Sequence, residues 1–274
     1  MIGPQDEAPK EGAGTFQDAV TVELCDLDRG VCAFTRFVRA AGDPDSSGTA
    51  IACVGGKTVA TVVDPARIVL ETGEPLVRWA CRFEHDAVVL EAELEAVSAP
   101  IELGEPVAAA AGVHGYEQLC RVRGAIRVGD TRTEIDGVGR RAHEWGEPTP
   151  ARRRSLYAVA GDRAVTVTAV RPPEAAEHGA ELIAGHMVRA ESAPEPFETA
   201  RLSTIYDDAG RPRTAGLELL LPDAEYPRRV SGAAVCHAAA DSREPFQAAC
   251  FRWSFDGEAA QGGYHLVSAR VSDT

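Results

Sequence analysis

Gly115-Tyr116-Glu117-Gln118 and the returning stretch Gly139-Arg140-Arg141-Ala142-His143-Glu144-Trp145-Gly146 decide the fold of this chain. From 116 to 128, most even positions are apolar or small and most charged side chains are odd, the period of a half-buried strand. Gly129-Asp130 then supplies a turn, because glycine accepts a positive φ angle, and the chain returns through 131–138. The sequence therefore predicts a long hairpin that ends in His-Glu-Trp-Gly.

The same alternation, interrupted by Gly, Pro and Asp turns, recurs on both sides of the hairpin. The segment 90–96 also has the composition of a helix, but its strict alternation favours a strand. Strands are predicted at 19–24, 31–39, 50–54, 57–63, 77–83, 90–96, 155–160, 164–170, 181–190, 201–206, 216–221, 228–238, 246–255 and 264–271. Many short strands with no helix of ordinary length predict an all-β protein of the barrel or sandwich type.

From the length of 274 residues we expect either two domains or one large all-β unit. The Pro-rich bridge 147–154 is the predicted boundary, which gives an N-terminal β-domain over 1–150 and a C-terminal β-domain over 151–274. Residues 1–15 are acidic and rich in Gly and Pro, so we expect a flexible tail there. They also lack the basic start and apolar core of a signal peptide, which favours a cytoplasmic protein.

Composition and charge exclude several classes of partner. The net charge of −14 argues against a nucleic acid or an anionic membrane surface as partner. No apolar run approaches the length of a membrane span. The 7 cysteines include no Cys-x-x-Cys pair and are odd in number, which favours reduced, buried thiols. The sequence leaves the formation of a homodimer open.

One basic run, Arg152-Arg153-Arg154, follows the central motif. It is interpreted as a solvated linker, with a site for a carboxylated ligand as the alternative. The histidines lack metal-ligand spacing such as His-Glu-x-x-His, and no phosphate loop or dinucleotide fingerprint is present. The prediction is a protein that needs no metal, nucleotide or flavin.

The residues Tyr116-Glu117-Gln118, Asp136-Gly137-x-Gly139 and His143-Glu144-Trp145-Gly146 resemble the two-domain lipocalin-like proteins related to carotenoid 1,2-hydratases and AttH proteins. The resemblance is specific over 115–146 and architectural elsewhere. It implies two lipocalin-like β-domains in tandem and an apolar small-molecule ligand. The family includes enzymes that hydrate or cyclise polyenes and, more distantly, pericyclases.

The chain departs from the family at one position of the motif. The family's Asp before the histidine is Ala142 here, while Glu144 lies two positions on and points to the same side of the strand. Glu144 is therefore the predicted acid, with His143 and Tyr116 as further catalytic residues. The predicted substrate-binding residues are Trp145, Glu117, Gln118 and Arg141.

Each of these residues also has a structural interpretation. The histidine and the indole of such a strand end can serve packing alone, and Glu117 can form a salt bridge to an arginine. The favoured function is a cofactor-independent cyclase, an isomerase or lyase acting on an apolar polyketide or terpenoid intermediate. The alternatives are an alkene hydratase, a non-catalytic carrier of a lipophilic ligand, and a purely structural β-protein.

Overall fold

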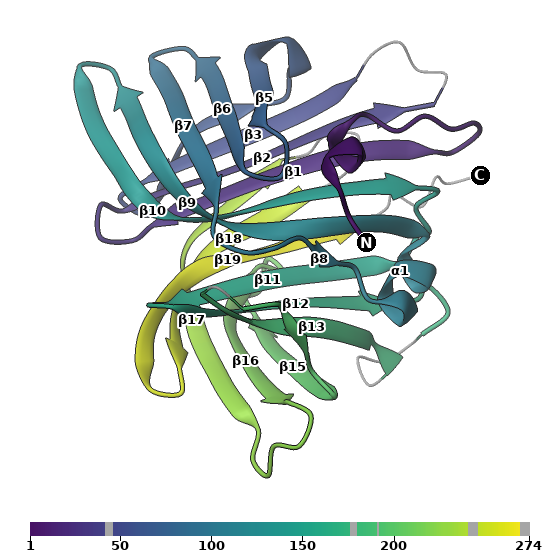
Figure 1. The fold of residues 1–274 in the computed structure, drawn as a ribbon. Helices are drawn as coiled ribbons and strands as arrows, with labels where there is room; N and C mark the ends of the chain where they lie inside the picture. The colour runs from purple at the N-terminus through teal and green to yellow at the C-terminus, as the bar shows by residue number, and fades with distance from the viewer. Residues whose placement is uncertain (42–45, 176–179, 191, 241–245, 269–274) are drawn as a thin grey trace. The chain divides into compact units, whose positions relative to one another are not determined.

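Two antiparallel β-sheets and one short α-helix make up the part of the chain that the structure, a computed structural model, describes: residues 1–41, 46–175, 180–190, 192–240 and 246–268 (Figure 1). The all-β prediction is confirmed. The chain divides into two compact units, Met1–Glu102 with Val113–Pro148, and Leu103–Gly112 with Thr149–Thr274. The short excursion 103–112 therefore belongs to the second unit, although it lies within the sequence of the first.

The first unit holds a sheet in the order β4-β3-β2-β1-β10-β9-β7-β6-β5, with β8 paired to β9. It also contains two 3-10 turns, η1 and η2. The bounds of these elements are η1 (Pro4–Glu7), β1 (Gln17–Asp26), β2 (Val31–Ala40), β3 (Ser47–Val54), β4 (Lys57–Val62), η2 (Pro65–Arg67), β5 (Ile68–Glu74), β6 (Arg78–His85), β7 (Val88–Ala96), β8 (Ile101–Glu102), β9 (Val113–Val128) and β10 (Thr131–Gly146).

The second unit repeats this topology. Its sheet has the order β14-β13-β12-β11-β19-β18-β17-β16-β15, which matches the first sheet strand for strand once β8 is set aside. The sequence itself shows no repeat that would reveal this. The elements are α1 (Glu105–Ala111), β11 (Arg152–Ala160), β12 (Arg163–Arg171), β13 (Leu182–Arg189), β14 (Glu195–Pro196), β15 (Thr199–Tyr206), β16 (Pro212–Leu220), β17 (Arg228–Ala240), β18 (Phe246–Phe255) and β19 (Glu258–Ser268).

The helix α1 is short because both of its ends are marked in the sequence. A proline lies in its first turn, where the missing N–H costs nothing. Gly112 ends it in the left-handed conformation at φ 68°, with its N–H directed at the carbonyls of Ala108 and Ala109. Within the ranges that the structure describes, no helix has the length and apolar character needed to cross a membrane.

The hydrophobic core of the first unit lies on one face of its sheet, which we call the inner face. Phe83 on β6 and Leu90 on β7 are register partners there and are fully buried, and Val22 on β1 and Val122 on β9 belong to the same core. Burial of each such side chain contributes about 1.5–3 kcal/mol. The sheet curls around this core, so that β4 contacts β6.

The predicted hairpin is present as β9 and β10, each 16 residues long. Gly129 begins the turn between them at φ 58°, the conformation for which the sequence indicated glycine. The pairing continues without interruption from Thr131 opposite Val128 to Gly146 opposite Val113. The central motif is therefore held in register by a ladder that runs the full length of both strands.

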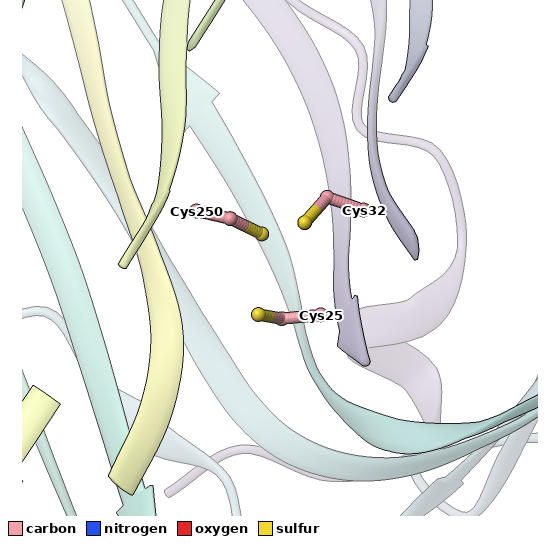
Figure 2. Close-up of side chains that lie close together, drawn as sticks. All are labelled: Cys25, Cys32 and Cys250. Carbon is pink, nitrogen blue, oxygen red and sulfur yellow. The ribbon is translucent and has the colours of Figure 1, made fainter. Parts of the chain in front are cut away.

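All seven cysteines are buried and free, as the sequence predicts. Cys25 on β1 and Cys32 on β2 are register partners, and their sulfur atoms lie within 4.8 Å of each other in the first unit (Figure 2). Cys250, also drawn in Figure 2, belongs to β18 of the second unit. The free thiols agree with the reduced state expected from the cysteine spacing.

Candidate active site

The register of the first sheet divides the predicted site residues between its two faces. Residues directly opposite each other in an antiparallel pair point to the same face. Tyr116 lies opposite His143, and Gln118 lies opposite Arg141. Asp18 on β1 lies opposite Trp145. These side chains point to the same face as Val22 and Val122, which is the inner face. The residues between them in each strand point to the opposite, outer face.

His143 and Asp18 form a buried pair on the inner face. Asp18 Oδ1 lies 2.6 Å from His143 Nε2, and the two side chains are 2% and 1% exposed. Asp18 Oδ2 also accepts a hydrogen bond from Arg39 at 3.2 Å, which holds the carboxylate in its orientation. A carboxylate accepts hydrogen bonds, so in the neutral imidazole Nε2 carries the proton and Nδ1 carries the lone pair.

Two buried side-chain atoms of this region lack a hydrogen-bond partner among the described residues, Nδ1 of His143 and Oε1 of Gln118. Buried polar atoms almost always have partners, so a ring nitrogen without one requires an explanation. A bound water, or a ligand with an acidic proton, would satisfy it.

Two aromatic side chains pack around the imidazole. The ring centroid of His143 is 5.2 Å from that of Trp145 and 5.9 Å from that of Tyr116, both with edge-to-face geometry. Tyr116 and Trp145 are themselves 6.4 Å apart. The three rings give the pair with Asp18 a largely apolar environment, in which electrostatic interactions are strong.

Glu7 occupies a cradle of four donors beside this cluster. Its Oε1 accepts hydrogen bonds from the Tyr116 hydroxyl at 2.9 Å and from the Leu76 N–H at 3.2 Å. Its Oε2 accepts from Trp79 Nε1 at 3.3 Å and from Arg141 Nη2 at 2.5 Å. The side chain of Glu7 is 5% exposed.

The segment around Glu7, within the predicted flexible tail 1–15, makes further contacts with the first unit. Besides the Glu7 contacts, Lys10 forms an ion pair with Asp6 at 3.1 Å, and its Nζ lies 5.0 Å from the centroid of the Trp145 ring. The acidic composition suggested solvation, but one of these acids instead neutralises Arg141. The N-terminal segment therefore covers part of the inner face.

Arg141 and Tyr116 are held by mutual contacts. Arg141 Nη1 donates to the Tyr116 hydroxyl at 2.9 Å, and the guanidinium lies 4.8 Å from the centroid of the Trp79 ring. Burial raises the pKa of Tyr116 above its usual range, although the charge of Arg141 opposes the shift. The phenol thus keeps its proton and remains a hydrogen-bond donor.

Gln118 has a positioning role in this geometry. Its Nε2 donates to the carbonyls of Leu76 at 3.1 Å and Ser98 at 3.0 Å. These bonds fix two loop segments against β9. The Leu76 N–H that Gln118 helps to place is one of the four donors to Glu7.

The two predicted carboxylates of the motif lie on the outer face. Glu144 Oε2 is 3.6 Å from Arg36 Nη1. Glu117 accepts a hydrogen bond from Arg140 at 2.8 Å, and Arg140 also forms a buried ion pair with Glu23. Glu117 is therefore part of a salt bridge, the structural interpretation that its sequence context allowed. Neither carboxylate shares a face with His143.

Gly115 is required where β9 passes Glu144. A Cβ at this position would lie 2.4 Å from the carbonyl oxygen of His143 and 2.9 Å from the Cα of Glu144, and the residue has φ 158°. Only glycine permits this close approach. It keeps the strand end with His143 tightly paired to β9.

Sequence reasoning missed Asp18 and Glu7, the carboxylates that contact His143, Tyr116 and Arg141. Asp18 directly precedes the predicted strand 19–24. It is two and four residues from Val20 and Val22, and this spacing was the one sequence feature that could have placed it on their face. Nothing in the sequence marks Glu7, because its partners Arg141 and Tyr116 follow more than a hundred positions later.

Comparisons with known proteins agree with this architecture. The model of the family described as "Domain of unknown function (DUF7064)" matches residues 3–265. No curated protein matches the chain in sequence. A protein assigned as AttH from Nitrosomonas europaea has 14% identity and a TM-score of 0.64, with 94% of this chain and 93% of that chain covered.

Two further solved structures are similar at the same level. Kievitone hydratase from Nectria haematococca has 11% identity and a TM-score of 0.64, covering 100% of this chain and 94% of its own. CghA, solved with Sch210972, has 10% identity and a TM-score of 0.64, covering 95% of this chain and 89% of its own. The resemblance to AttH proteins is thereby confirmed, and at these identities it shows the fold alone.

Proposed function

The chain belongs to the DUF7064 family and shares the fold of AttH, kievitone hydratase and CghA, and from this premise we propose that it is a cofactor-independent enzyme of proton transfer. It is a cyclase, isomerase or hydro-lyase that acts on an apolar small molecule of polyketide or terpenoid type. One observation carries the proposal: the buried pair of Asp18 and His143 leaves the ring atom Nδ1 without a partner.

The arrangement suits acid–base catalysis at one nitrogen. Nδ1 of the neutral ring takes a proton from the carbon next to a substrate carbonyl, and the electron pair of the C–H bond moves to the carbonyl oxygen as an enolate forms. The imidazolium then returns that proton, either to another carbon of the conjugated system or to a hydroxyl that leaves as water. Protons balance in both cases, and no oxidant or reductant is needed.

Asp18 stabilises the positive ring between these two steps. The two side chains are 2% and 1% exposed, so the attraction acts where water screens it little. Because Arg39 also donates to Asp18, the carboxylate cannot turn away from the ring. Asp18 is thus a positioning residue that acts through His143.

Arg141 and Tyr116 are the proposed donors to the oxygen on which negative charge develops. The carboxylate of Glu7 that they now hold is an anion of the same kind, which supports this role. Trp145 is the proposed apolar wall beside the imidazole. Glu144, the acid expected from the motif, lies near Arg36 on the outer face and would serve a substrate bound on that side only.

Hydrogen exchange into the substrate tests the proposal without knowledge of the product. The protein is incubated in D2O with conjugated, enolisable polyenes, and deuterium uptake is followed by mass spectrometry. We expect uptake with the wild type and a loss of about 10²–10⁴-fold in His143→Gln, the usual contribution of a general base. His114→Gln is the matched control, since His114 is an exposed histidine on the neighbouring strand β9.

Three results would count against proton transfer by His143. Tight binding without any deuterium uptake by the wild type would identify a carrier. Full product formation by His143→Gln, together with its loss in Trp145→Ala, would indicate a binding template that accelerates a pericyclic step by orientation. Activity lost on dialysis against a chelator and restored by one metal would contradict a mechanism without cofactors.

A further inference from the structure

A cavity lined by arginines lies in the second unit. It has a volume of about 430 Å³, and its lining includes the three consecutive arginines of the basic run. The remaining charged lining residues are Arg171 and Glu181. Four guanidinium groups thus share a cavity with one carboxylate, in a chain whose net charge is −14.

Two of these arginines face each other directly. Arg152 on β11 and Arg171 on β12 are register partners, so their side chains point to the same face. Like charges in this position repel and destabilise the sheet. Neither has an ion pair with a carboxylate among the residues that the structure describes. The repulsion therefore has no compensation from the described protein groups.

Arg154, two positions along the same face, forms the buried end of the cavity. Its side chain is 4% exposed, it forms an ion pair with Glu181, and Nη1 donates to Thr204 at 2.9 Å. Its Nε is buried and has no hydrogen-bond partner among the described residues. Glu181 is thus engaged with Arg154, and the outer pair of arginines remains to be neutralised.

The same cavity has an apolar wall. Leu266, the register partner of Arg154 on β19, and Tyr206 on β15 line it, and Leu266 packs against the hydrophobic core of the second unit. A simple inorganic anion would contact the arginines but would leave the apolar wall of Leu266 and Tyr206 exposed to water. A ligand with a charged head and an apolar body would cover both parts.

We propose that this cavity binds an amphipathic organic anion, whose carboxylate or phosphate oxygens are held by Arg152 and Arg171. Arginine forks pair with such oxygens in bidentate geometry. The apolar body lies along Leu266 and Tyr206. The basic run is then part of an anion site, the alternative to the solvated linker that its sequence suggested. This site is independent of the proton transfer proposed for His143.

Calorimetry with four probes tests the site: sodium decanoate, decyl phosphate, decanol and inorganic phosphate. We expect both decyl anions to bind, and the stronger of the two to identify the headgroup. The double variant Arg152→Gln/Arg171→Gln should lose about tenfold in affinity for each guanidinium removed. Arg213→Gln, an exposed arginine of the same unit, should bind as the wild type does.

Thermal unfolding provides a second measurement on the same variants. Without ligand, the double variant should unfold at or above the wild-type temperature, because the repulsion between the facing arginines is gone. Decanoate should then raise the unfolding temperature of the wild type only. Equal binding of decanol, tighter binding of inorganic phosphate than of the decyl anions, or unchanged affinity in the double variant would overturn the proposal.

Discussion

His143 and Glu144 are neighbours in the sequence, but their side chains leave β10 on opposite faces of the first sheet. His143 contacts Asp18 on the inner face, whereas Glu144 lies 3.6 Å from Arg36 on the outer face. Successive residues of a strand alternate between faces, so no movement of side chains alone brings the two together. The acid and the base of the motif therefore cannot act on one substrate atom.

The first prediction separates these two residues. Glu144→Gln should change deuterium uptake into a substrate by no more than a few-fold, because the inner face retains its histidine and aspartate. Uptake measured by mass spectrometry beside His143→Gln gives the comparison. A loss of about 10²–10⁴-fold in Glu144→Gln with normal activity in His143→Gln would return the catalytic role to Glu144.

The second prediction concerns the anchor of the N-terminal segment. Glu7→Ala leaves Arg141 buried beside Tyr116 without its carboxylate. Breaking a buried ion pair costs about 3–5 kcal/mol. Because release of the segment lets water reach Arg141, we expect the free energy of unfolding to fall by only about 2 kcal/mol. Urea denaturation measures this fall in stability. The rate of backbone amide hydrogen exchange should also rise across residues 3–10.

Glu11→Ala is the control for this change, since Glu11 is an exposed acid of the same segment. It should alter stability by less than about 0.5 kcal/mol. Equal stabilities of the two variants would show that Glu7 does not hold the segment in solution.

The third prediction concerns the outer face of the first sheet. Arg140 is 2% exposed and pairs with Glu23, which is fully buried. Arg140→Met removes the cation that pairs with this buried carboxylate and with Glu117, so the free energy of unfolding should fall by about 3–5 kcal/mol. The double variant Arg140→Met/Glu23→Leu should recover part of the loss, because both buried charges are then removed.

An exposed pair on the same strand serves as the comparison. Arg132 and Glu134 are paired at 2.8 Å with side chains 60% and 66% exposed. Arg132→Met should change the free energy of unfolding very little, because solvent screens exposed ion pairs. Similar losses for Arg140→Met and Arg132→Met would contradict the burial of the Arg140 pair.

The fourth prediction is a decline of stability at alkaline pH. Burial raises the pKa of Cys81 from 9.0 to about 11 and that of Cys120 from 9.0 to about 12. Below pH 9 both thiols are protonated in the folded and unfolded states, so their contribution to the free energy of unfolding is fully present. Above pH 9 the unfolded state ionises first, and stability falls until the folded pKa values are reached.

Denaturation at pH 8 and pH 10 measures this slope. In Cys81→Ala the free energy of unfolding should fall less between pH 8 and pH 10 than in the wild type. The cavity that the substitution leaves lowers stability at both pH values and does not affect this difference. The native protein should also react slowly with iodoacetamide at pH 8, and all seven thiols should react after unfolding. Rapid native alkylation of Cys81 would contradict its burial.

Local patterns in the sequence determined the strands and the turns of this protein. The alternation over 90–96 specified β7 against a helix-forming composition, and Gly129 specified the turn between β9 and β10. These features depend on φ and ψ preferences and on the period of two, which act over a few residues. The same period also determined that His143 and Glu144 point in opposite directions.

Only the tertiary structure decided which carboxylates meet the motif and which face of the strand is the inner one. Asp18 reaches His143 because β1, far away in the sequence, is the neighbour of β10 in the sheet. Glu7 reaches Arg141 across 134 positions, and Arg152 faces Arg171 through the register of β11 and β12. Spacing along the chain contains no signal for such contacts, since they form only when burial of the apolar faces curls each sheet around its core.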